Sequence, residues 1–309
     1  DVTQEELGGS RVHCRKSGVG DLEVADDEEC IDVIKRYLSY LPSHNGEPPP
    51  VRQAADPVDR ADEELLDVLP ESNRKPYDIH DVIPRIVDDG EILELKPQWA
   101  RTIVTCFARF GGRPAGIVAN QPRQLGGILD NDSSDKAARF VNLCNAFGVP
   151  LVFLQDVPGF MVGTKVEAAG IIRHGSKMLH AVANATVPKV TVVLRKAYGA
   201  GYYVMNGRAY EPDLIVAWPS AEISVMGAEG AVEIVMRRQV EEADDPAAKR
   251  AELVEAYRKI IDVYIAARNG LIDDVIDPRE TRPVICRALE MAQHKRVERP
   301  WKRNAVVPV

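Results

Sequence analysis

Several features that mark particular classes of protein are missing from this sequence. Its five cysteines are scattered and form no CxxC pair; they are Cys14, Cys30, Cys106, Cys144 and Cys286. This spacing argues against a zinc site and a disulfide framework, and it fits a reducing compartment. No apolar stretch approaches the roughly 20 residues of a membrane helix, and no signal peptide is recognisable. We expect no membrane span and a cytoplasmic location, or the mitochondrial matrix if the source is eukaryotic.

An excess of positive charge is also missing. The formal net charge is −8 and the isoelectric point is near 5.4, so nothing favours nucleic acid as a partner. The hydrophobic content of 45% and the charged content of 28% are those of an ordinary soluble globular protein. A chain of 309 residues can form one large domain or two modest ones, each with a hydrophobic core.

Motifs for catalysis by side chains are missing too. The sequence has no GxSxG elbow, and no His/Cys/Asp cluster has the spacing of metal ligands, so we expect no metal. His174 and Ser176 lie within a helical stretch where their spacing does not form a useful dyad, and we interpret His174 and His180 as structural. An enzyme with this sequence is expected to depend on backbone donors.

The most informative stretch runs from residue 190 to residue 205. The β-branched run Val190–Leu194 predicts a buried strand, and a glycine-rich turn over residues 199–201 leads into a predicted helix at Tyr202. A dinucleotide fingerprint is the weaker interpretation, because Val204 occupies the sixth position of GxGxxG. Unpaired N–H groups at such a turn favour an anion or oxyanion site made of backbone.

The chain divides into three parts by composition. Apolar residues at helical spacing predict a helix over residues 31–41, and Pro42 ends it. Residues 42–62 are rich in proline and are interpreted as an extended linker. The main domain is then expected over residues 63–309, with a charged, solvated helical segment at 237–268 and a tail at 295–309 outside the core.

Within the main domain, strands and helices alternate. A hairpin is predicted from strands 99–109 and 114–119, and further strands from 149–154, 190–194 and 214–218. Helices are predicted over 133–147, 165–185, 229–237 and 283–292. This order predicts an α/β fold with mostly parallel strands. Ligands in such folds bind at the strand-to-helix turns, so the turns at 120–127, 156–163 and 198–201 are expected to form one site.

Several motifs resemble the carboxyltransferase (β) subunits of biotin-dependent acyl-CoA carboxylases of the propionyl-, methylcrotonyl- and acetyl-CoA types. They are Gly116–Pro122, Asp135–Phe140, Asp156–Phe160, Ile171–Gly175, Ala185–Lys189, Arg195–Tyr198, Ala217–Pro219 and Val225–Ala228. The resemblance implies a crotonase-like fold, a spiral of ββα units, of which this chain is the C-terminal, biotin-side half. Residues 1–41 look like the end of the N-terminal half, the rest of which is expected on a separate chain or elsewhere in a longer one.

The resemblance also implies an activity. Such enzymes transfer CO2 from carboxybiotin on a carrier protein to the α or γ carbon of an acyl-CoA. The expected partners are the N-terminal carboxyltransferase half, the biotin carboxyl carrier and the biotin carboxylase, in a homo- or hetero-oligomer that is a hexamer in the family. Two alternatives remain open: a biotin-dependent acyl-CoA decarboxylase or transcarboxylase subunit, and a non-catalytic scaffold subunit.

Site residues follow from the same resemblance. The catalytic oxyanion hole is expected at Gly199, Ala200 and Gly201. The biotin side is expected at Asn120, Gln121, Val157, Pro158, Gly159, Phe160 and Gly163, and the acyl-CoA side at Gly126, Gly127, Tyr202 and Tyr203. The turn sequence leans toward the methylcrotonyl type and Arg195–Tyr198 toward the propionyl type. Tyr203 occupies the position of the family's substrate-selecting residue, so the acyl group is not assigned.

Overall fold

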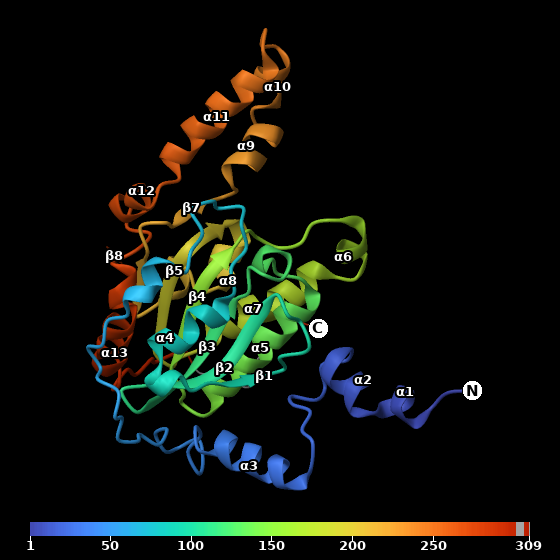
Figure 1. The fold of residues 1–309 in the computed structure, drawn as a ribbon, viewed down its shortest axis with the longest axis vertical. Coiled ribbons are helices and arrows are strands. Elements are labelled where there is room, and N and C mark those ends of the chain that lie inside the picture. The colour runs from blue at the N-terminus through green and yellow to red at the C-terminus, as the bar shows by residue number, and fades with distance from the viewer. Residues whose placement is uncertain (301–305, 309) are drawn as a thin grey trace.

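An eight-stranded mixed sheet forms the centre of the protein (Figure 1). The structure is a computed structural model and describes residues 1–300 and 306–308. The strands follow the order β1-β2-β3-β4-β5-β6-β8, and β7 pairs separately with β5. Their bounds are β1 Leu93–Leu95, β2 Ile103–Phe110, β3 Arg113–Asn120, β4 Leu151–Val157, β5 Lys189–Tyr198, β6 Leu214–Ala217, β7 Glu222–Ser224 and β8 Asp274–Val275.

Helices flank the sheet and also extend beyond it (Figure 1). The α-helices are α1 Gln4–Gly8, α2 Ser10–Arg15, α3 Asp27–Leu38, α4 Ile83–Ile86, α5 Asn131–Ala146, α6 Thr164–Ala168, α7 Ile171–Asn184, α8 Gly199–Val204, α9 Ala228–Ile234, α10 Arg237–Glu241, α11 Pro246–Ile260, α12 Val263–Arg268 and α13 Thr281–Met291. The 3-10 helices are η1 Glu63–Leu66, η2 Ile79–Asp81, η3 Asp88–Gly90, η4 Leu125–Gly127, η5 Arg208–Tyr210 and η6 Pro278–Glu280.

The sheet is antiparallel at one end and parallel over the rest. β1, β2 and β3 pair antiparallel, while β3, β4, β5, β6 and β8 follow one another in parallel. The predicted hairpin is confirmed: β2 and β3 pair from Ile103↔Asn120 to Phe110↔Arg113, and Gly111 and Gly112 turn between them with positive φ. The parallel strands are connected through helices, as predicted for an α/β fold.

Helices cover both faces of the sheet. On one face, α4 and α13 pack with alternate residues of β2, β4 and β5 in a core that includes Ile83, Leu289 and Val192. On the other face, α5 and α7 pack against the intervening residues, including Phe107 and Phe153. Because both faces are covered, the central strands are almost continuously apolar. The result is a three-layer α/β/α arrangement with the strand ends free for a site.

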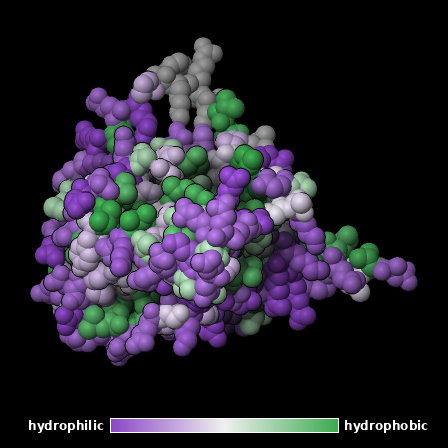
Figure 2. Space-filling model, turned by 90° about the horizontal axis from the view of Figure 1, so that it is seen from above, coloured by the Kyte–Doolittle hydropathy of each residue, from purple (hydrophilic) through white to green (hydrophobic). Residues whose placement is uncertain are grey.

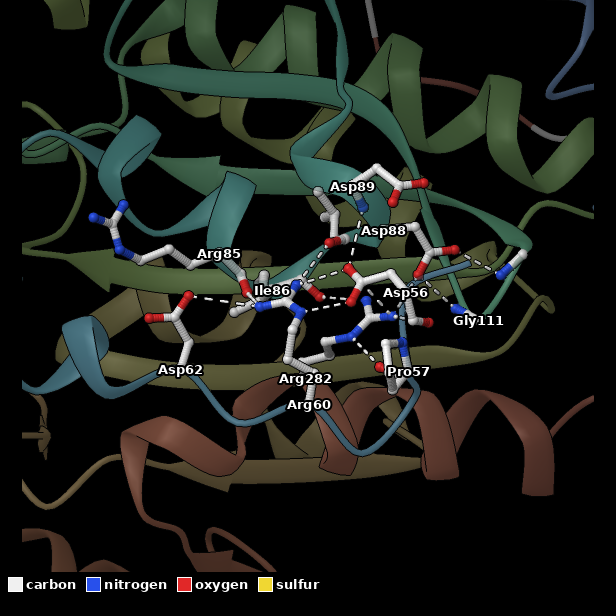
Figure 3. Close-up of polar contacts among 12 residues, drawn as sticks. Asp56, Pro57, Arg60, Asp62, Arg85, Ile86, Asp88, Asp89, Gly111 and Arg282 are labelled. Carbon is white, nitrogen blue, oxygen red and sulfur yellow. Dashed lines mark hydrogen bonds and ion pairs between the residues drawn. The ribbon is translucent and has the colours of Figure 1, made fainter. Parts of the chain in front are cut away.

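The proline-rich segment 42–62 contains no helix or strand, and its second part is hydrogen-bonded to the sheet domain. Arg282 of α13 is 1% exposed and donates to the carbonyl oxygens of Pro57 and Asp56 and to the Asp88 carboxylate. The same Asp88 carboxylate accepts the N–H groups of Gly111 and Gly112 in the hairpin turn (Figure 3). This buried network joins the connector, α13 and the hairpin. The domain boundary at residue 62 stays a prediction.

Two predicted helices differ from the observed ones. The helix predicted over 31–41 is α3, which begins at Asp27 because the Asp26 side chain accepts the N–H of Glu29. Its apolar residues Ile31, Ile34 and Leu38 are exposed, at 50–57%. The single long helix predicted over 165–185 is wrong: Gly170, in a left-handed conformation, separates α6 from α7.

The charged segment after residue 227 forms an arm that projects from the body (Figure 1). Helices α9, α10 and α11 share a small core of their own, centred on Val232 and Val254. Ion pairs such as Arg250–Glu233 and Lys249–Glu252 lie on its surface. Over residues 237–260 the arm therefore has the solvated, charged surface that the sequence predicted, whereas α12, in the rest of the predicted segment, packs against the sheet through Val263 and Ala266. Of the predicted tail 295–309, residues 301–305 and 309 lie outside the described residues.

The surface seen in Figure 2 is mostly hydrophilic, and its apolar residues gather in separate groups. Within residues 1–300 and 306–308, none of the helices combines the length and the apolar character that a membrane span requires.

Candidate active site

The three predicted turns lie together at the carboxyl ends of β3, β4 and β5. Asn120 at the end of β3 donates to the carbonyl oxygen of Gly127 at 3.1 Å and accepts the N–H of Asp156 at 3.2 Å. The Gly159 carbonyl accepts the N–H of Leu129 at 3.0 Å. A Cβ atom on Gly201 would lie 3.2 Å from the Gly159 Cα. The structure therefore brings the turns together as expected for neighbouring parallel strands.

Asn120 and Gln121, expected on the biotin side, are buried within this assembly of turns. Asn120 is 0% exposed, and its amide joins two turns as described above. Gln121 is 4% exposed; its oxygen accepts the N–H of Ile79 and of Arg123, and its nitrogen donates to Asp78. Their hydrogen-bonding groups are occupied by the protein itself. Both side chains fix the loop rather than offer free groups to a ligand.

A buried ion pair, which the sequence did not reveal as a pair, connects β4 to β5 beneath the turns. Arg195 Nε lies 2.9 Å from Asp156 Oδ2, and both side chains are at most 4% exposed. The other oxygen of Asp156 accepts the N–H of Lys196, and the Arg195 guanidinium lies over the Tyr77 ring. Burial raises the pKa of Asp156, and Arg195 opposes that shift. Their sequence motifs were recognised, but their 39-residue separation hid the contact.

The turn at Gly199 is itself the first turn of helix α8. Gly199 has φ of 55°, and a Cβ there would lie 2.8 Å from the carbonyl oxygen of Val225. Gly201 is buried, and a Cβ there would lie 2.8 Å from Val157 Cγ2. Both positions therefore require glycine for close packing. The first four N–H groups of a helix have no acceptor within it. Within residues 1–300 and 306–308 no other acceptor is found for those of Ala200 and Gly201, so these groups are available to a ligand.

An apolar cleft of about 440 Å³ opens beside α8. Among the expected site residues, Phe160, Ala200 and Tyr203 line it, together with Met161, Val162, Ile171 and Ile172. Tyr203 is 46% exposed. Tyr202, expected to contact substrate, is buried instead; its hydroxyl donates to the Leu271 carbonyl and accepts the Arg208 N–H. The structure thus favours Tyr203 over Tyr202 as a residue of the cleft.

The remaining expected residues belong to the turns at 120–127 and 156–163. Val157 and Gly127 are buried, whereas Pro158 and Gly126 are partly exposed and Gly163 is exposed. Gly126, Gly127, Gly159 and Gly163 all have positive φ, which glycine adopts at the least cost. Among the described residues, no group of three or more His, Cys, Asp or Glu side chains is placed to hold a metal ion.

His80 holds the loop at residues 120–127 through Asp78 and Gln121. Its Nδ1 lies 2.8 Å from Asp78 and its Nε2 lies 2.8 Å from Glu94 of β1. Asp78 in turn accepts from Gln121 at 2.7 Å. The Glu94 hydrogen bond, reinforced by the Asp78 contact and opposed by partial burial, raises the pKa of His80 to about 9. An imidazolium therefore bridges two carboxylates, one of which holds Gln121.

We expect this bridge to make stability depend on pH. The pKa of His80 is higher in the folded state than the unfolded value of about 6.5. The contribution of protonated His80 to the free energy of unfolding is therefore complete below pH 6.5 and is lost as the pH rises through 9. Because 39% of the imidazole is exposed, we discount the effect to about 1 kcal/mol.

The measurement is urea unfolding at pH 6 and pH 10 for the wild type and the His80→Gln variant. The difference in the free energy of unfolding between the two proteins should be smaller at pH 10 than at pH 6 by about 1 kcal/mol. Burial lowers the pKa of Lys136 to about 8, so the free energy of unfolding of both proteins also rises with pH as Lys136 loses its proton. Comparing the two proteins cancels this shared change. A constant difference across this range would contradict the prediction.

The sequence matches the carboxyl transferase domain family over residues 1–307. The chain belongs to this family. It is 49% identical over 309 residues to the methylmalonyl-CoA carboxyltransferase 12S subunit of Propionibacterium freudenreichii subsp. shermanii, covering all of this chain and 59% of that one. It is 45% identical over 309 residues to the mitochondrial propionyl-CoA carboxylase beta chain of Homo sapiens, covering 100% of this chain and 56% of that one.

Solved structures agree with the sequence match. The 12S transcarboxylase structure, a hexamer with methylmalonyl-CoA and methylmalonic acid bound, superposes with a TM-score of 0.96 over 100% of this chain and 59% of that chain, at 49% identity. The beta subunit of P. aeruginosa geranyl-CoA carboxylase gives 0.70 at 32% identity, over 98% of this chain and 58% of that one. The fold is crotonase-like, as expected. The chain spans less than two thirds of the length of these family members.

Proposed function

We propose that this chain is part of the carboxyltransferase component of an acyl-CoA carboxylase. That component transfers CO2 from carboxybiotin to the α or γ carbon of an acyl-CoA. The observation that carries the proposal is the start of α8, where Ala200 is exposed and Gly201 is buried, at the meeting point of three glycine-rich turns in a chain of the carboxyl transferase family. The apolar cleft beside α8 supplies the space for an acyl group.

The N–H groups of Ala200 and Gly201 are the proposed oxyanion donors, and Gly199 sets their direction. They are backbone groups held by tight packing against Val157 and Val225, so they need no reorganisation when charge develops on an acceptor oxygen. Biotin, when bound, supplies the CO2 in carboxylated form. Its ureido oxygen is a hydrogen-bond acceptor, and it therefore fits a site whose free groups are N–H donors.

The surrounding loops have separate roles in this proposal. Val157, Pro158, Gly159, Phe160 and Gly163 form the biotin-side wall. The buried amide of Asn120 holds the start of that wall through Asp156, while the amide of Gln121 fixes its own loop through Ile79, Arg123 and Asp78. Gly126, Gly127 and Tyr203 belong to the acyl-CoA side. The exposed phenol of Tyr203 limits the length or shape of the acyl group that the cleft accepts.

We further propose that the active assembly includes an N-terminal carboxyltransferase half, a biotin carboxyl carrier and a biotin carboxylase. This proposal is supported by the greater length of the relatives and by the hexamer described for the 12S transcarboxylase. The decarboxylase or transcarboxylase alternative is supported by another relative, the methylmalonyl-CoA decarboxylase subunit alpha of Propionigenium modestum, at 44% identity over 310 residues, covering 100% of this chain and 60% of that one. The same site serves either direction of transfer.

The test uses the complete protein that carries this chain, assembled with its carrier and carboxylase partners. We expect labelled bicarbonate, ATP and an acyl-CoA to give a labelled carboxyacyl-CoA with at least one acyl-CoA in a panel of different chain lengths. Transfer from a carboxyacyl-CoA without ATP would favour the decarboxylase or transcarboxylase alternative. No label with any acyl-CoA and no transfer from any carboxyacyl-CoA would disprove the proposed activity.

A further inference from the structure

A second cavity, polar rather than apolar, lies beside the same turn. Its volume is about 390 Å³, and Lys196 and Tyr198 at the end of β5 line it just before Gly199. Pro158, in the turn at 156–163, also lines the cavity, and so do Glu222, Glu229 and Arg258. The cavity is thus bordered by two of the three turns of the candidate active site.

Most charges in this cavity already have partners. Glu229 Oε1 lies 2.9 Å from Arg74 and 2.7 Å from Arg258. Glu222 accepts hydrogen bonds from Asn73 and from the Tyr198 hydroxyl. Glu71 is exposed at the rim. The two inner carboxylates are therefore satisfied without Lys196.

Lys196 is the exception. Its backbone N–H donates to Asp156 at 3.1 Å, but in the part of the chain that the structure describes no acceptor lies within bonding distance of its Nζ. Desolvation by the surrounding protein lowers its pKa. The Nζ atom is not fully buried, and its donor positions are free for a ligand in the cavity that Lys196 lines. An anion bound in the cavity would gain a charge-assisted hydrogen bond from it.

The position of Lys196 indicates which anion fits. It lies three residues before Gly199, and the reaction proposed above moves a carboxylate past this turn. We propose that the Lys196 ammonium group binds the carboxylate that is transferred, with the polar cavity as its site. This inference rests on the proposed function. The carboxylate comes either from the carboxylated carrier or from a carboxylated acyl-CoA, and the two sources share the chemistry that Lys196 recognises.

The experiment compares Lys196→Met and Lys196→Arg in the complete protein. Lys259→Met is the matched control, because Lys259 is exposed on α11 and does not line the cavity. One arm measures the affinities of methylmalonyl-CoA and propionyl-CoA by calorimetry. The other arm measures the apparent KM for the carboxylated carrier during transfer to propionyl-CoA. The first arm needs no catalysis, so it separates failure of this inference from failure of the proposed function.

We expect Lys196→Met to weaken the binding of either methylmalonyl-CoA or the carboxylated carrier by about 10- to 100-fold, the range for a hydrogen bond to a charged group. Propionyl-CoA affinity should stay unchanged, and Lys196→Arg should recover most of the loss. A weaker methylmalonyl-CoA complex assigns the carboxylate to the acyl-CoA, whereas a raised KM for the carrier alone assigns it to carboxybiotin. The inference is overturned if neither parameter changes, or if both acyl-CoAs are weakened equally, as a structural role predicts. If the wild type transfers no carboxylate, unchanged methylmalonyl-CoA affinity in Lys196→Met likewise overturns it.

Discussion

Replacing Gly201 by valine is expected to reduce carboxyl transfer by about 100- to 1000-fold, the range for loss of one oxyanion donor. A Cβ at this position would already lie 2.8 Å from Val157 Cγ2 and 3.2 Å from the Gly159 Cα. Val157 is buried and cannot move aside, so the start of α8 and the turn at Gly159 must separate. That separation displaces the N–H groups of Ala200 and Gly201 from the ligand. The measurement is the transfer rate at saturating substrates.

A matched control is available in the same chain. Gly230 lies within α9, and a Cβ there would meet nothing within 4 Å. Gly230→Ala should leave transfer unchanged and stabilise the helix by roughly 0.5–1 kcal/mol. Circular dichroism of Gly201→Val should show native helix content, so that lost activity is not attributed to unfolding. Full activity of a folded Gly201→Val protein would favour the scaffold alternative over catalysis by this turn.

Strands β2 to β6 and the meeting of the three turns were predictable because they depend on local patterns. The apolar run Val190–Leu194 identified β5, and the glycines after it identified the turn. The end of β5 was missed: it continues to Tyr198 because Lys196, Ala197 and Tyr198 pair with β7, a contact between distant segments. Sequence spacing cannot show such pairing. It also cannot show that α6 and α7 are separate, which depends on the left-handed conformation of Gly170.

Side-chain roles were harder to predict than positions. Asn120 and Gln121 were expected on the biotin side because of the family resemblance. The structure shows their amides occupied by Gly127, Asp156, Ile79, Arg123 and Asp78. A polar residue in a turn can contact either a ligand or a neighbouring turn, and only the three-dimensional arrangement distinguishes the two. The same limit explains why Lys196 was recognised in a motif without a role.

Replacing Arg282 by methionine is expected to lower the free energy of unfolding by about 3–5 kcal/mol, the range for removing one partner of a buried ion pair. The guanidinium is 1% exposed and lies 2.7 Å from Asp88. It also donates to the carbonyl oxygens of Asp56, Pro57 and Ile86 (Figure 3). Methionine fills most of the volume but leaves these acceptors and a buried carboxylate without their donor.

Urea unfolding of the complete protein measures this loss, and two further variants define its origin. Arg282→Lys keeps the charge but cannot reach all the acceptors, so its stability should be intermediate. Arg287→Met removes an exposed arginine from the same helix and should change stability by less than about 0.5 kcal/mol. Equal losses for Arg282→Met and Arg287→Met would contradict the assignment, because exposed and buried arginines of α13 would then contribute alike. A loss confined to Arg282 would show that the buried network that joins the connector, the hairpin and α13 contributes to stability, and that the exposed side of α13 does not.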